Sequence, residues 1–66
     1  MQISYGRLKF KGYYLNGNWE FNDGNEIKKF SYHIHECVKC LNELSKDGWK
    51  LVWAFDSTEF ILEKIQ

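Results

Sequence analysis

The sequence predicts one α+β domain over residues 1–66, a four-stranded antiparallel sheet with one helix packed on one face. Two stretches in which apolar and polar residues alternate precede a segment of helical periodicity, and two more follow it. An Asn-Gly pair follows the first stretch and a glycine closes the helical one, as hairpin turns and helix ends require. The predicted order is therefore strand, strand, helix, strand, strand (ββαββ).

The first strand is predicted from Ile3 to Leu15, followed by a turn at Asn16-Gly17. Asn-Gly favours a type I′ turn, because both of its central residues need positive φ. A turn at this point places Gly12 opposite Phe21 and extends an apolar face across both strands. The predicted apolar face carries Leu8, Phe10, Tyr14, Trp19 and Phe21, and the opposite face carries Ile3, Tyr5, Arg7, Lys9, Lys11 and Tyr13.

A helix is predicted to begin between Asn25 and Ser31 and to end at Gly48. Ser31 is a suitable N-cap, whereas Asp23 with Glu26 three residues later resembles a capping box for the earlier start. The later start is preferred, because the longer helix would span roughly 33 Å at 1.5 Å per residue, too long for so small a sheet. The predicted buried stripe is Ile27, Phe30, Ile34, Cys37, Val38, Leu41 and Leu44.

The last two strands are predicted at residues 49–55 and 59–65. A symmetric hairpin would place Phe55 opposite Phe60 and Trp53 opposite Leu62, with Trp49 and Leu51 on the same inward face. One helix covers only one face of such a sheet. The uncovered face predicts a homodimer through Val52, Ala54, Ile61 and Ile65, with an ordinary solvated face as the alternative.

The uncovered face is also the predicted binding surface, because it interleaves basic and aromatic residues. Such a surface suits an acidic host protein or a small nucleotide-like signal, and nucleic acid is the further alternative. Nine basic residues balance nine acidic ones, which argues against general attraction to nucleic acid. A solvated edge strand, where lysines oppose aggregation, explains the same pattern. The predicted binding residues are Tyr5, Arg7, Lys9, Lys11, Tyr13 and, beside the hairpin tip, Trp19.

The segment His33 to Cys40 contains the residue types that bind zinc. On a helix, His33, Cys37 and Cys40 would share one side and present three ligands. A fourth ligand is missing, and a free cysteine inside an apolar stripe is usually a small buried hydrophobe. Packing is therefore preferred to metal binding, and no cofactor is predicted.

Enzyme and membrane functions find little support in the sequence. There is no glycine-rich phosphate loop and no nucleophile with a recognisable base. No apolar run approaches the ~20 residues of a membrane span. Two cysteines are too few for a disulfide framework, so a cytoplasmic, non-enzymatic chain is expected.

Residues 31–66 resemble a small bacterial and phage family of unknown function. The likeness is carried by Leu41, Leu44 and the run Gly48-Trp49-Lys50-Leu51-Val52, followed by a hairpin that ends in Phe60-Ile61-Leu62-Glu63-Lys64. The resemblance implies a strand, helix and hairpin, with no catalytic residues. The expected function is a phage or mobile-element binding module that inhibits or sequesters a host protein or signalling molecule. The alternative is a nucleotide or nucleic-acid binder.

Overall fold

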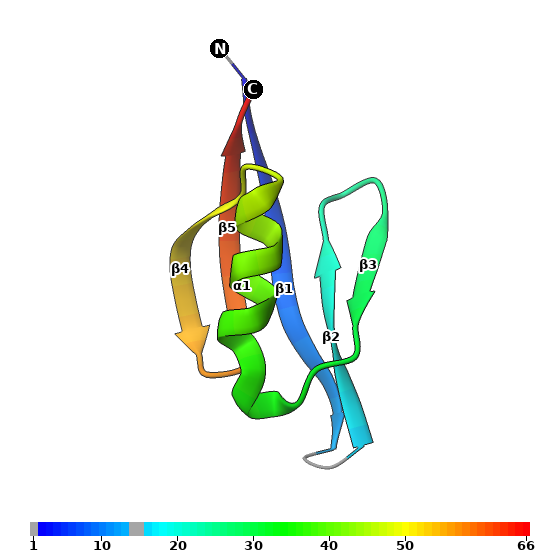
Figure 1. Ribbon diagram of the computed structural model, residues 1–66. Helices are drawn as coiled ribbons and strands as arrows, with labels where there is room; N and C mark the ends of the chain where they lie inside the picture. Colours follow the sequence, from blue (N-terminus) through cyan, green and yellow to red (C-terminus); the bar gives the residue numbers. More distant parts are fainter. Residues whose placement is uncertain (1, 14–15) are drawn as a thin grey trace.

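The computed structural model describes residues 2–13 and 16–66. In this part of the chain, five strands form one antiparallel sheet in the order β3-β2-β1-β5-β4, and α1 packs on one face (Figure 1). The elements are β1 (Ile3–Tyr13), β2 (Asn16–Asn22), β3 (Ile27–Phe30), the 3₁₀ turn η1 (Ile34–Glu36), α1 (Cys37–Lys46), β4 (Lys50–Asp56) and β5 (Glu59–Ile65). The α+β class is confirmed, and the predicted four strands are corrected to five.

The first hairpin has a different register from the predicted one. Gly12 pairs with Gly17, and Phe21 pairs with Leu8, so Asn16-Gly17 belongs to β2 and is not the turn. Gly17 serves packing, since a Cβ there would stand 2.4 Å from Cζ of Phe10. The new register differs from the predicted one by an even number of residues, which keeps every side chain on its predicted face. The predicted places of Tyr14 and Leu15 lie outside the described residues.

Strand β3 occupies residues that were expected to begin the helix. The carboxylate of Asp23 accepts hydrogen bonds from the backbone N–H groups of Asn25 and Glu26, at 2.8 and 2.9 Å. Gly24 adopts φ +93°, which completes a tight connection between β2 and β3. The pattern that resembled a helix cap is therefore a hairpin turn. It allows Phe30 to pair with Trp19.

The helix begins later than either predicted start. His33 is extended (φ −65°, ψ 161°), and its backbone N–H donates to a carboxylate oxygen of Glu36 at 2.8 Å. Lys39 also pairs with this carboxylate. The contact with Lys39 and, to a smaller extent, the hydrogen bond from His33 lower the pKa of Glu36. Val38 is 61% exposed, so it leaves the predicted stripe. The residues that face the sheet from α1 are Cys37, Cys40, Leu41 and Leu44.

Helix α1 ends at Lys46, and the left-handed residue that terminates it is, as predicted, Gly48. This residue adopts φ +93°, and its N–H donates to the carbonyl of Ser45 at 3.0 Å. The N–H of Trp49 donates to the carbonyl of Leu44 at 3.1 Å, which closes the last turn. The buried core of the described chain is Leu8, Phe10, Trp19, Phe21, Phe30, Cys40, Leu44, Trp49, Phe60 and Leu62.

Strand β4 is irregular. It pairs with β5 through two bulges, which leave Val52 and Phe55 without a partner on β5. As a result Trp53 lies opposite Ile61 and Ala54 lies opposite Phe60, one position away from the predicted symmetric hairpin. Within the described residues, no helix is long and apolar enough to cross a membrane.

Candidate interaction surfaces

The sheet face opposite α1, called here the open face, carries the predicted basic and aromatic residues together. Alternate residues of β1 point to it, because strand side chains alternate between faces. Tyr5 is 59% and Tyr13 is 84% exposed. The open face therefore presents the predicted set Tyr5, Arg7, Lys9, Lys11 and Tyr13 from a single strand.

Carboxylates accompany these cations. Arg7 pairs with Glu59 at 3.4 Å between Nε and a carboxylate oxygen. Lys9 lies opposite Glu20 of β2 on one side and Glu59 of β5 on the other. Acidic and basic side chains thus alternate across β2, β1 and β5, so the electrostatic potential of this part of the open face is mixed in sign.

The other half of the open face is mostly apolar, although it also contains Glu63, opposite Tyr5, and Lys50, opposite Glu63. Ile3 pairs with Ile65, and Ile61 lies between Arg7 of β1 and Trp53 of β4. A shallow hollow of about 430 Å³ lies beside this half and is lined by Tyr5, Gly6, Arg7, Asn22, Gly24 and Ile61. The apolar half consists of Ile3, Tyr5, Trp53, Ile61 and Ile65.

Trp19 does not belong to this surface. Its side chain is 0% exposed, and its indole Nε1–H donates to the carbonyl of His33 at 2.8 Å. Its ring packs edge-on against Phe10 at 5.4 Å and stacks with Phe60 at 6.0 Å between centroids. The structure does not support the prediction that Trp19 binds a ligand, because the observed register places it farther from the hairpin tip and its face of the sheet is buried.

The four predicted dimer residues do not share one face. Ala54 lies opposite the buried Phe60, on the side of the sheet that faces the helix, and Val52 lies at a bulge. Ile61 and Ile65 remain on the open face. Trp53, predicted as core, takes the missing place there and is 63% exposed.

The three candidate metal ligands do not share a helical side, because His33 precedes α1 in an extended conformation. Cys40 is buried, and burial raises the pKa of its thiol to about 12. A thiolate is the form that binds zinc, so this environment disfavours it. Within residues 2–13 and 16–66, no cluster of three His, Cys, Asp or Glu side chains could hold a metal ion.

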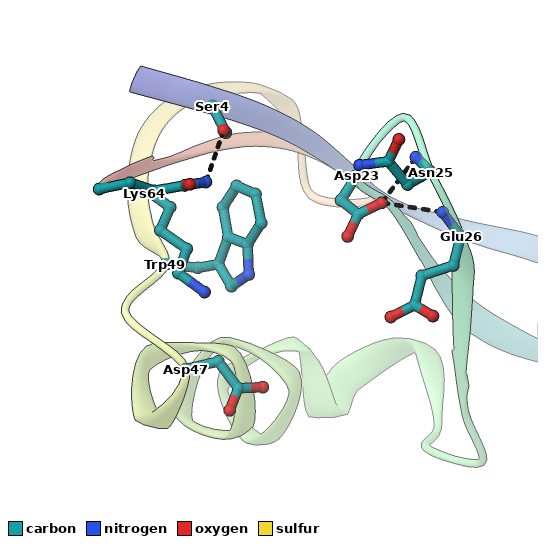
Figure 2. Close-up of a pocket in the computed structure, with 8 residues that line it drawn as sticks. Ser4, Asp23, Asn25, Glu26, Asp47, Trp49 and Lys64 are labelled. Atoms are coloured by element: carbon teal, nitrogen blue, oxygen red, sulfur yellow. Dashed lines mark hydrogen bonds between the residues drawn. The ribbon is translucent and has the colours of Figure 1, made fainter. Parts of the chain in front are cut away.

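A polar cavity of about 260 Å³ is lined by Ser4, Asp23, Asn25, Glu26, Asp47, Trp49, Lys64 and Gln66. Figure 2 shows this pocket in close-up. Backbone hydrogen bonds from Glu26 and Asn25 hold the pKa of Asp23 below its usual value. Asp47 pairs with Lys28 of β3 at 3.3 Å, and Nζ of Lys64 lies 5.7 Å from the centroid of a Trp49 ring. These contacts join β3 and β5 to the residues that follow α1, which gives the polar groups a structural role.

Strand β4 was expected to contribute three inward side chains, yet every residue of it is exposed. It lies at one edge of the sheet, and Figure 1 shows α1 over β1 and β5 rather than over β4. Leu51, on the helix side opposite Leu62, is consequently 49% exposed. The sequence does not signal this exposure, because an unbroken apolar run such as Leu51 to Phe55 ordinarily indicates a buried strand.

The fold and these surfaces define a small α+β domain with one open sheet face and one apolar edge strand. In comparisons with known proteins, the chain matches no family model, no curated protein and no solved structure.

Proposed function

We propose that the chain is a non-enzymatic protein-binding module and that its open face is the binding surface. The observation that carries this proposal is the exposure of several large apolar side chains on one half of the open face, around Glu63. Tyr5 is 59%, Trp53 63% and Ile65 53% exposed. Contiguous apolar patches with polar rims mark interaction sites in soluble proteins.

The charges of the open face indicate the kind of protein that it suits. Arg7, Lys9 and Lys11 follow the apolar half along β1, and their carboxylate neighbours leave the surface mixed in sign. A protein that presents an apolar segment followed by side chains of both charges complements both halves. By the family resemblance noted above, such a module would come from a phage or mobile element. It would act by occupying a host protein.

Site-specific photocrosslinking tests this proposal. A benzophenone amino acid is introduced at Tyr5 of the open face or, as the control, at Val38 of α1, which is 61% exposed. The expected result is one crosslinked protein from the Tyr5 position that is absent from the Val38 position. Equal labelling from both positions, or none from Tyr5, contradicts the assignment of the open face.

A second candidate function is binding of a nucleotide or of single-stranded nucleic acid. It is favoured by Arg7, Lys9 and Lys11 lying between the exposed rings of Tyr5 and Tyr13, since bases stack on rings while cations hold phosphates. The neighbouring carboxylates weigh against it.

Fluorescence anisotropy with a labelled oligonucleotide tests this second function. Binding should weaken steeply with salt, and replacing the three cations by alanine should abolish it. Affinity that is independent of salt and of these substitutions excludes this function.

A further inference from the structure

The outer edge of β4 is long and contains no proline, and the features there that oppose edge pairing are its two bulges and the terminal Lys50. Edge strands usually carry lysine or proline, or are very short. Strand β3, at the other edge, has only four residues and two of them are lysines. Strand β4 has seven residues, and its five central positions are Leu51, Val52, Trp53, Ala54 and Phe55, all exposed.

The sequence of β4 is complementary to itself when read in the opposite direction. If two copies lie antiparallel with Trp53 opposite Trp53, Lys50 of each copy faces Asp56 of the other. In the same alignment Leu51 faces Phe55, and Val52 faces Ala54. Each apolar side chain therefore meets an apolar one, and each end of the pair joins opposite charges.

The observed sides of the sheet agree with this alignment. Residues that face each other across an antiparallel pair project to the same side. Lys50, Trp53 and Asp56 lie opposite Glu63, Ile61 and Glu59 of β5, whose side chains are on the open face. Lys50 and Asp56 can therefore meet across the pair, and the two Trp53 rings can meet at its centre.

We propose that β4 pairs antiparallel with β4 of a second copy of this chain, with Trp53 at the two-fold axis. The axis of an antiparallel pair is perpendicular to the sheet, so the two sheets become continuous. Both helices then lie on one side and both open faces on the other. The proposed homodimer forms through the edge of the sheet, in place of the face that the sequence suggested, and does not depend on what the open face binds.

Complementary charges at the axis provide the test. Trp53→Lys and Trp53→Glu each place two like charges opposite each other, and Trp53 is exposed enough for either variant to fold. Sedimentation velocity from micromolar to millimolar concentrations should show a wild-type dimer. Each variant alone should raise the dimer dissociation constant by about a hundredfold. An equimolar mixture of the two variants should form a heterodimer, because the introduced ammonium group of one copy then faces the introduced carboxylate of the other.

Two further substitutions separate edge pairing from other modes of association. Ile65→Lys lies on the open face, away from β4, and should leave the dimer intact, whereas a dimer through the open faces would be lost. Val38→Lys on α1 is the control for added charge. A monomeric wild-type chain at millimolar concentration, a Trp53→Lys variant that still dimerises, or a dimer lost in Ile65→Lys overturns the proposal. None of these outcomes bears on crosslinking from Tyr5.

Discussion

Substitution of Trp19 by phenylalanine should remove much of the stability of the fold. The change deletes two buried ring carbons, at about 0.8 kcal/mol each, and one hydrogen bond, at about 1 kcal/mol. That bond joins the Trp19 indole of β2 to the carbonyl of His33, just before η1. The expected loss of about 2.5 kcal/mol compares with the roughly 3–5 kcal/mol that a core of this size supplies. The melting temperature should fall by about 10–20 °C.

Urea unfolding followed by circular dichroism measures this loss, with two matched tryptophan substitutions for comparison. Trp49→Phe removes the same two carbons from a buried indole that donates no hydrogen bond to the described residues. Its loss in free energy of unfolding should therefore be smaller, and the difference between the two variants measures the hydrogen bond from Trp19 to His33. Trp53→Phe, at a 63% exposed position, should cost less than about 0.5 kcal/mol. If Trp19→Phe is no more destabilising than Trp53→Phe, the assignment of Trp19 to the core is refuted.

Gly6→Val should lower the free energy of unfolding by about 2–3 kcal/mol in the same assay, because a Cβ would stand 2.3 Å from Cζ of Phe21; an unchanged urea midpoint would show that the ring moves freely. Iodoacetamide should alkylate Cys37 in the folded chain and reach Cys40 only on unfolding, since burial raises the pKa of the Cys40 thiol to about 12; mass spectrometry that finds equal labelling of both thiols contradicts this environment. Hydrogen bonds from Thr58 lower the pKa of Asp56 in the folded chain. The ionised carboxylate of Asp56 therefore contributes its full stabilisation above the unfolded-state pKa, and this stabilisation is lost as the pH falls through the folded-state pKa. Thermal melts from pH 6 to pH 2 should therefore show a steeper loss for the wild type than for Asp56→Asn, and parallel curves would be evidence against this role.

The faces of the first hairpin could be predicted from the sequence although its turn could not. The alternation from Ile3 to Tyr13 correctly separates the buried side, with Leu8 and Phe10, from the open one. Asn16-Gly17 was a strong turn signal, but here the glycine is needed beneath the ring of Phe10. A preference of neighbouring residues for a turn cannot reveal that a distant ring requires the same glycine.

Strand β3 and the exposure of β4 could not be predicted, because in both places the periodicity of the apolar residues does not match the structure. Ile27 and Phe30 continue the three- and four-residue spacing of the helix, so periodicity extended the helix across a short strand. The sequence also contains a turn at Asp23-Gly24, which would separate β3 from a helix. The residues that make the hydrogen bonds of this turn match the sequence pattern of a helix cap, so the turn was not recognised. In β4 the bulges at Val52 and Phe55 interrupt the two-residue period on which the predicted inward face depended.

The place of β1 in the sheet has a consequence for how the chain acquires its structure. This strand is synthesised before the other strands, yet it lies between β2 and β5 and pairs Ile3 with Ile65. Contacts between residues so distant in sequence slow folding, since a long loop must close before they form. During translation β1 and β2 can associate early, but the opposite side of β1 must wait until β5 has been made. Folding should therefore be completed only after the whole segment has left the ribosome, in one cooperative step.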